Sequence, residues 1–267
     1  MVGASVETPP VTGFYARIAR HYDAEHRDKC DDLAFYEGLI DAHGPGALLE
    51  PGCGSGRVLF HLAQRLDTVH GIDSEAAMLE RARRRLATPP AQQQARIRLV
   101  QGDVLQVAAP QRYRYALLAY NCLMHFHEQE AQLALLRRLH DWLLPEGLLV
   151  IDLPNAGEAF AGPDSDELTL ERSFVDPESG HLIMQLATSR LDRVTQLMHT
   201  TWVYDEIDGD GVLHRTLAPV VFRYFFRPEL ALLLGQCDFV TEACFGDYDQ
   251  GPFEDGCPRL LVLARRA

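Results

Sequence analysis

Short apolar runs separated by amphipathic stretches set the pattern of most of this 267-residue chain. Each run has the length of a strand, and the stretch that follows places its apolar residues at helical spacing. Alternation of this kind indicates an α/β fold. The runs are residues 48–50, 68–72, 97–100, 115–120, 148–153, 239–245 and 260–264.

Two other regions have patterns of their own. Residues 11–43 carry two apolar stripes at helical spacing, which predict two helices. Residues 156–225 alternate with a period of two around turn-forming segments at 176–180 and 208–211, which predicts antiparallel hairpins. The stripe residues are Phe14, Tyr15, Ile18, Ala19 and Tyr22 in the first helix, and Leu33, Tyr36, Leu39 and Ile40 in the second.

The first apolar run ends in Glu50 and a turn with glycines at alternate positions, Gly52, Gly54 and Gly56. Glycine lets the backbone take conformations closed to other residues and lets a small molecule lie against the main chain. A tight structural turn would show the same glycines. The next run, however, ends in Asp73, where an acid can accept hydrogen bonds from both hydroxyls of a ribose. Together these residues favour a nucleoside site.

The spacing of the glycines separates two kinds of nucleoside ligand. A dinucleotide site requires G-x-G-x-x-G, with the third glycine packing helix against strand. This chain has G-x-G-x-G, and the carboxylate of Glu50 would repel a pyrophosphate and attract an ammonium or sulfonium group. The turn therefore favours a nucleoside that carries positive charge.

Glu50 followed by G-x-G-x-G resembles the first motif of the class I, Rossmann-like S-adenosylmethionine-dependent methyltransferases of the small-molecule type. Segments 74–79, 101–104, 121–126 and 144–153 continue the resemblance in the family's order. It implies a doubly wound sheet of seven strands, one of them antiparallel and formed within the closing pair of runs. It also implies S-adenosyl-L-methionine as the methyl donor and S-adenosyl-L-homocysteine as its product.

The resemblance also implies which residues contact the cofactor. Met78 would lie near the adenine, and Asp103 would reach its amino group. The implied contact residues are Tyr22, Glu50, Gly52, Cys53, Gly54, Gly56, Asp73, Ser74, Met78, Gly102, Asp103, Val104, Tyr120 and Asn121. Two positions depart from the family pattern: Arg114 stands where many relatives have an acid, and segment 236–239 lacks the usual glycine. Neither departure concerns the cofactor contacts.

The helices of residues 11–43 and the hairpins of residues 156–225 have functional counterparts in relatives. In relatives such helices lie over the cofactor pocket, and such an insertion covers the active site. The stripes of residues 11–43 would also suit plain packing on the core, and a structural or dimerising flap is the alternative for the hairpins.

Methyl transfer from a sulfonium is an in-line displacement, so the enzyme must hold the acceptor atom, the methyl carbon and the sulfur in line. A base is needed only if the acceptor atom arrives protonated. His125, in the loop after the fourth run, is the candidate base; the alternative is a histidine that only shapes the pocket. His125 and His127 could suggest a metal, but no carboxylate set accompanies them, so we expect no metal. The candidate acceptor-site residues are Tyr15, His125, Tyr204, Arg223 and Tyr248, with Tyr120 a further candidate there.

The composition of the chain restricts the class of acceptor molecule. Twenty-five basic and thirty-eight acidic residues give a formal net charge of −13, which argues against a nucleic-acid substrate. The one dense basic run, residues 81–85, is expected to be a solvated helix end. Six scattered cysteines without zinc spacing, a start without signal-peptide features and no membrane-length apolar stretch favour a cytoplasmic protein.

We therefore expect an enzyme that methylates nitrogen or oxygen of a small molecule and acts as a monomer or homodimer, without nucleic-acid or membrane partners. The alternatives are a nucleic-acid or protein methyltransferase, or a module that binds the cofactor without transferring methyl. The expected division of the chain is a disordered tail (1–10), a helical lid (11–43), a core (44–155 and 226–267) and an inserted β roof (156–225).

Overall fold

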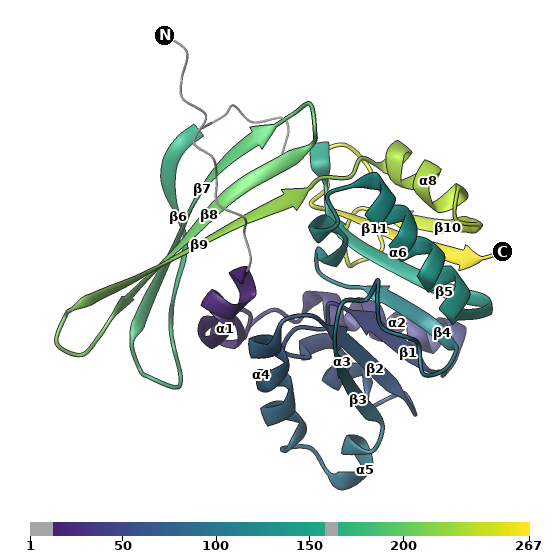
Figure 1. Cartoon of the computed structure of the whole chain (residues 1–267), viewed down its shortest axis with the longest axis horizontal. Helices are drawn as coiled ribbons and strands as arrows, with labels where there is room; N and C mark the ends of the chain where they lie inside the picture. The colour runs from purple at the N-terminus through teal and green to yellow at the C-terminus, as the bar shows by residue number, and fades with distance from the viewer. Residues whose placement is uncertain (1–12, 158–164) are drawn as a thin grey trace.

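The computed structural model describes residues 13–157 and 165–267 (Figure 1). Its larger sheet has seven strands, in the order β10-β11-β5-β4-β1-β2-β3. β11 runs antiparallel to both of its neighbours, and the other pairings of the sheet are parallel. The strands are β1 (Leu48–Pro51), β2 (Val69–Asp73), β3 (Ile97–Gln101), β4 (Tyr113–Leu118), β5 (Leu143–Pro154), β10 (Phe239–Phe245) and β11 (Arg259–Arg266). The expected seven-stranded sheet with one antiparallel strand is confirmed.

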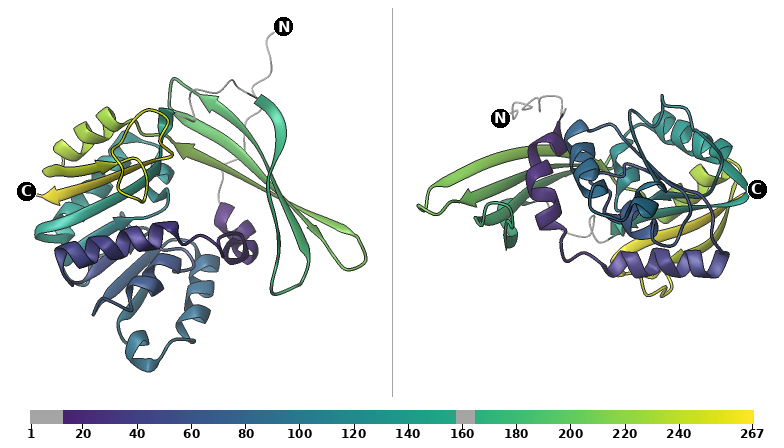
Figure 2. Two further views of the ribbon diagram at one scale, coloured as in Figure 1. Left: turned by 180° about the vertical axis from the view of Figure 1, so that it is seen from behind. Right: turned by 90° about the horizontal axis from the view of Figure 1, so that it is seen from below.

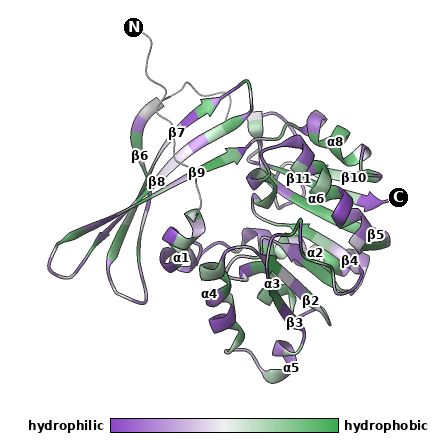
Figure 3. Ribbon diagram, viewed as in Figure 1, coloured by the Kyte–Doolittle hydropathy of each residue, from purple (hydrophilic) through white to green (hydrophobic). Residues whose placement is uncertain are grey.

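Helices cover both faces of this sheet, and a separate hydrophobic cluster lies at each face. On one face Phe35, Leu59 and Leu79 pack against the sheet, and on the other Leu136 and Leu233 do so. The helices are α2 (Asp31–His43), α3 (Arg57–Leu62), α4 (Ala76–Leu86), α5 (Ala91–Gln94), α6 (Gln129–Trp142) and α8 (Arg227–Gly235). Figure 3 shows the strands of the sheet as mainly hydrophobic and parts of α4 as hydrophilic. This is the doubly wound arrangement, which leaves the carboxyl ends of the parallel strands free to form a site.

A second, four-stranded antiparallel sheet lies between β5 and α8 in the chain, in the order β6-β7-β8-β9. Helix α1 (Phe14–Glu25) packs on one face of it, where Phe14 and Ile18 meet Ile183 and Val220 (Figure 2). The strands are β6 (Ser165–Val175), β7 (Leu182–Asp192), β8 (Leu197–Ile207) and β9 (Leu213–Arg223). Helix α1 therefore lies between this sheet and the core, whereas α2 packs directly on the larger sheet.

The structure differs from the expected elements in three places. The four inserted strands form an antiparallel sheet as expected, but β7 and β8 also pair across a turn without glycine that was not predicted. In that turn the Asp192 carboxylate accepts hydrogen bonds from the backbone of Val194 and the hydroxyl of Thr195. The sequence predicts a helix from Gln129 to Leu144. The helix ends at Trp142, since Leu143 is fully buried and pairs with Tyr113 in the sheet.

The third difference concerns the basic run, residues 81–85 of α4. Asp23 of α1 accepts hydrogen bonds from Arg81 at 2.7 Å, from Arg85 at 3.1 Å and from the Ser55 hydroxyl at 2.5 Å. Arg81 also donates to Glu178, in the turn between β6 and β7, at 2.8 Å. Two of these arginines thus tie α1 and the second sheet to the core, and the expected solvated helix end is wrong for them.

The expected tail, residues 1–10, lies outside the described residues. Across residues 13–157 and 165–267, no helix combines the length and the apolar character that crossing a membrane requires.

Candidate active site

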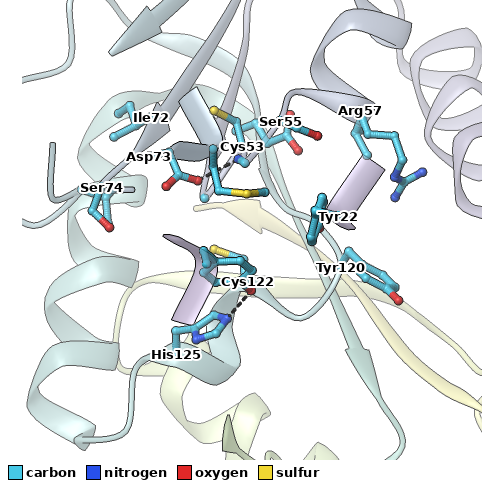
Figure 4. Close-up of a pocket in the computed structure, with 18 of the residues that line it drawn as sticks. Tyr22, Cys53, Ser55, Arg57, Ile72, Asp73, Ser74, Tyr120, Cys122 and His125 are labelled. Atoms are coloured by element: carbon cyan, nitrogen blue, oxygen red, sulfur yellow. Dashed lines mark hydrogen bonds between the residues drawn. The ribbon is translucent and has the colours of Figure 1, made fainter. Parts of the chain in front are cut away.

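A cavity of about 430 Å³ opens at the carboxyl ends of β1, β2 and β4, beneath α1 (Figure 4). Figure 4 shows Asp73, Tyr120 and His125 around the same space. The sequence-predicted residues that line it are Tyr15, Tyr22, Glu50, Gly52, Cys53, Gly54, Asp73, Ser74, Met78, Gly102, Asp103, Val104, Tyr120 and His125. One cavity therefore holds residues proposed for the cofactor and residues proposed for the acceptor.

The turn after β1 brings backbone into contact with the cavity. Gly54 has a φ of +56°, in the left-handed region that side chains disfavour, and a Cβ there would lie 3.2 Å from Cε of Met78. Its amide donates to one Asp73 carboxylate oxygen at 2.7 Å, and the Glu75 amide donates to the other at 2.8 Å. Each of these oxygens keeps a further lone pair for a ligand. Burial raises the pKa of Asp73 from its usual value.

Glu50 is the second acid of the cavity, and it is almost completely buried. Only 3% of the residue is exposed, and among the described residues no group forms a hydrogen bond with its Oε2 atom. Burial raises the pKa of Glu50 to about 8, while nearby Arg57 opposes the rise. A buried carboxyl oxygen without a partner is costly, so this wall of the cavity is prepared for a donor or a cation.

Arg57, at the start of α3, lines the cavity but was not assigned a role from the sequence. It donates to both carboxylate oxygens of Asp32, at 2.8 and 2.5 Å, and to the Lys29 carbonyl at 3.0 Å. A cation directly after the glycine turn was the available signal. The other lining residues that sequence reasoning missed are Ser55, Val58, Ile72, Ala119, Cys122 and Phe126.

The far end of the cavity is formed by a pair of neutral rings. The Tyr15 hydroxyl and His125 Nε2 are hydrogen-bonded at 2.8 Å, and the His125 ring lies 5.4 Å from the ring of Phe222 on β9. Burial is the main cause that lowers the pKa of His125 to about 4, and burial also raises the pKa of Tyr15 well above its usual value. The pair is therefore uncharged at neutral pH.

Five of the predicted residues do not line the cavity. They are Gly56, Asn121, Tyr204, Arg223 and Tyr248. Gly56 serves the packing of α3, since a Cβ there would lie 2.4 Å from the Phe60 ring. Tyr204 points to α1, where its hydroxyl donates to Glu25 at 2.8 Å. The alternating pattern of β8 does not by itself say which face of the strand meets α1.

The remaining three belong to contacts between elements of the fold. Arg223 is buried and forms an ion pair with Glu229 of α8. Tyr248 donates its hydroxyl to Asp152, and the Asn121 side chain accepts a hydrogen bond from Arg259. His127, weighed above as a metal ligand, has its Nε2 2.9 Å from the Val221 carbonyl. Within the described residues, no three histidine, cysteine, aspartate or glutamate side chains are arranged to hold a metal.

The comparison with known families decides what kind of domain surrounds this cavity. Residues 48–147 match the family model described as a methyltransferase domain. This part of the chain is similar to a methyltransferase domain. The match covers the glycine turn, Asp73 and the loop that bears His125, and the expected resemblance to class I methyltransferases is confirmed.

Named relatives are similar to part of this chain. Over 158 residues it is 31% identical to the dTDP-3-amino-3,6-dideoxy-alpha-D-glucopyranose N,N-dimethyltransferase of Streptomyces fradiae. That alignment covers 57% of this chain and 59% of the relative, so the chain spans little more than half of that protein's length.

Solved structures share the whole fold of this chain. The CcbJ methyltransferase from Streptomyces caelestis is 22% identical with a TM-score of 0.72, and the match covers 97% of both chains. CalS10, an amino pentose methyltransferase from Micromonospora echinaspora, is 19% identical with a TM-score of 0.71, and the match covers 92% of this chain and 96% of that one. At such identities the likeness extends to the fold, second sheet included.

Proposed function

We propose that this protein transfers a methyl group from S-adenosylmethionine to the nitrogen of a small amine, an amino sugar or a close analogue. The observation that carries the proposal is the meeting, in one cavity, of two acids beside a glycine turn, the buried Glu50 and the partly buried Asp73, with a neutral tyrosine–histidine pair. The acids suit a positively charged nucleoside, and the neutral pair suits an uncharged amine. S-adenosylmethionine, when bound, supplies a methyl group on a sulfonium that is open to in-line attack.

The cofactor half of the cavity fits this nucleoside at three points. Asp73 offers both carboxylate oxygens to a ribose. The unpartnered Oε2 of Glu50 suits the ammonium group of the methionine part. Arg57, which lies in the same wall, suits its carboxylate. In this proposal the two ends of the amino acid are thus held by charges of opposite sign.

The chemistry of His125 favours nitrogen over oxygen as the acceptor atom. A hydroxyl must give up its proton as it attacks, and a histidine whose pKa is about 4 is a weak base for that step. A neutral amine already carries the attacking lone pair, and a cavity end without charge favours that form over the ammonium form. In this proposal Tyr15 and His125 hold the amine by a hydrogen bond and exclude water, and the proton leaves after transfer.

The relatives support the same class of acceptor. The Streptomyces fradiae protein is named for an amino-sugar nucleotide, and a further structural neighbour, KedS8 from Streptoalloteichus, is described as a sugar N-methyltransferase. The acidic chain, with its net charge of −13, fits a small acceptor better than a nucleic acid.

The test is to incubate the protein with S-adenosylmethionine that carries a deuterated methyl group and with matched pairs of acceptors. Each pair is an amino sugar, free or nucleotide-linked, and its counterpart with hydroxyl in place of the amine. Mass spectrometry should find the label on nitrogen, with one S-adenosylhomocysteine for each methyl. Gly54→Val should give no label. Label on the hydroxyl counterparts, or on RNA or protein in place of sugars, would overturn the proposal.

A further inference from the structure

The loop after β4 has an unusual backbone. Tyr120 and Asn121 are consecutive non-glycine residues with positive φ, 41° and 70°. Side chains disfavour this region, and a bulky residue such as tyrosine disfavours it more than asparagine does. Such strain persists only where surrounding contacts hold it in place. The contacts that hold this loop are therefore informative about its purpose.

Asp152 of β5 lies directly behind the loop and is fully buried. Its Oδ2 atom accepts hydrogen bonds from the Tyr36 hydroxyl at 2.7 Å, the Tyr248 hydroxyl at 3.0 Å and the Tyr120 amide at 3.3 Å. Arg259 of β11 donates to its Oδ1 atom from Nε at 3.0 Å. β5 and β11 are antiparallel neighbours in which Asp152 faces Leu261, so the acid and the arginine form a diagonal pair across the two strands.

The same arginine also reaches the loop. A terminal nitrogen of Arg259 donates to Oδ1 of Asn121 at 3.0 Å. The backbone N–H of Asn121 donates to the backbone carbonyl of Asp152 at 3.0 Å. Lys29, in the link between α1 and α2, stacks its ammonium over the Tyr120 ring at 5.1 Å. Residues from three distant parts of the chain thus fix the two strained positions.

The loop leads straight into the acceptor end of the cavity. The short 3₁₀ helix η1 (Cys122–His125) begins directly after Asn121, and Tyr120, Cys122 and His125 all line the cavity. The turn at Asn121 sets the direction in which η1 leaves the sheet, and hence where the His125 ring meets Tyr15. None of the bracing groups Asp152, Arg259 and Asn121 lines the cavity itself.

We propose that Arg259 and Asp152 are positioning residues: through Asn121 they hold the loop in its left-handed conformation and so place His125 for the acceptor. The effect on turnover rests on the proposed methyl transfer. The effect on the position of His125 does not. The residues proposed for cofactor binding, Glu50, Gly54 and Asp73, lie on β1, in the turn after it and on β2, so cofactor affinity should change little when the contacts of Asn121 are weakened.

A matched pair of variants at Asn121 isolates the conformation from the stability of the fold. Asn121→Ala loses the contact to Arg259 and disfavours positive φ, whereas Asn121→Gly loses the same contact but accepts positive φ freely. Asn121→Ala should lower kcat about 5–10-fold, and Asn121→Gly should stay at least about threefold faster than Asn121→Ala. The affinity for S-adenosylhomocysteine, measured by calorimetry, should change by less than about threefold in both.

Arg259→Met removes the other partner of the Arg259–Asn121 hydrogen bond and so tests the positioning role independently. If it folds, it should lower kcat at least as much as Asn121→Ala, and Asn121→Gly placed in the same chain should recover part of the loss, which a merely structural role would not allow. If it does not fold, the Asn121 pair still decides. Equal losses in Asn121→Ala and Asn121→Gly, or wild-type kcat in folded Arg259→Met, would overturn the proposal.

A readout without acceptor separates this proposal from the proposed function. The Cε1–H signal of His125 in an NMR spectrum, assigned by its loss in His125→Gln, should shift in Asn121→Ala and remain near the wild-type position in Asn121→Gly. An unshifted signal in Asn121→Ala would overturn the positioning role, even if the wild-type protein transferred no methyl to any amine.

Discussion

The two halves of the cavity, the one proposed for the cofactor (Glu50, Arg57 and Asp73) and the one proposed for the acceptor (Tyr15, His125 and Phe222), are built in different ways. The cofactor half comes from the ends of neighbouring strands and the turn after β1, and Asp73 in it is oriented by Gly54 and Glu75, both within 19 positions of it in the chain. The acceptor half joins Tyr15 to His125, 110 positions away, and adds Phe222 from the second sheet. Local geometry specifies the first half, whereas the second exists only once distant elements have packed.

The halves also differ in charge. The cofactor half contains Glu50, Asp73 and Arg57, all ionisable and all largely buried. The acceptor half ends in a pair that stays neutral, because burial lowers the pKa of His125 and raises that of Tyr15. Changes in pH near neutrality should therefore act on cofactor binding rather than on the acceptor end.

The largest effect is expected from a variant that disrupts only the cofactor half of the cavity. Gly54→Val adds a branched side chain at a φ of +56°, against Met78, and should weaken S-adenosylhomocysteine binding by at least about 100-fold in calorimetry. Gly211→Val is the matched control, since Gly211 has a φ of +78° and no atom within 4 Å of an added Cβ. Binding lost equally in the control would mean that backbone strain, not the ligand's space, explains the result.

The second prediction concerns the difference in charge between the two halves of the cavity. The pKa of Glu50 is raised to about 8 by burial, so its carboxyl is neutral at pH 6 and ionises as the pH rises towards 8. The ammonium of S-adenosylhomocysteine needs the ionised form, so affinity should rise with pH by up to about tenfold per unit between 6 and 8. Glu50→Gln should flatten this dependence.

The control for that pH dependence is a ligand rather than a variant. 5′-Methylthioadenosine keeps the adenosine part and lacks the amino acid, so its affinity should stay nearly constant over the same range. An equally steep rise for this ligand would place the titrating group elsewhere, for example at Asp73.

The smallest effect concerns how the two halves are held together. Arg81 joins α4 to Asp23 of α1 and to Glu178 of the second sheet, so Arg81→Met should speed S-adenosylhomocysteine dissociation in stopped flow by about threefold to fivefold. Arg84→Met is the control, because Arg84 pairs only with Glu80 in its own helix among the ion pairs of the described residues. Equal acceleration by both variants would contradict a role for Arg81 in closing the cavity.

The two halves of the cavity also differ in how far the sequence predicts them. The strand ends and the glycine turn could be located because periodicity and glycine spacing are local signals, and β10 was predicted with the bounds it has. The turn between β7 and β8 was missed, because a hydrogen-bonded Asp192 replaces the glycine signal there.

The acceptor half was predicted less well, for a physical reason. Whether Tyr204 or Tyr248 reaches the cavity depends on which partner takes its hydroxyl, and those partners, Glu25 and Asp152, lie more than ninety positions away. Tyr15 and His125, both expected at the acceptor site, line the cavity, but their hydrogen bond is a tertiary contact that no spacing in the sequence predicts.

The most direct test of this division measures two quantities on two variants, Asp73→Asn and Tyr15→Phe. The dissociation constant of S-adenosylhomocysteine is measured by calorimetry, and kcat is measured with saturating S-adenosylmethionine and an amino-sugar acceptor. Asp73→Asn should raise the dissociation constant about 10–100-fold and leave kcat within about threefold. Tyr15→Phe should leave the dissociation constant within about threefold and lower kcat about tenfold or more, at every pH between 6 and 8. If each variant changed both quantities to the same extent, the two halves would not be separable, and the account would be contradicted.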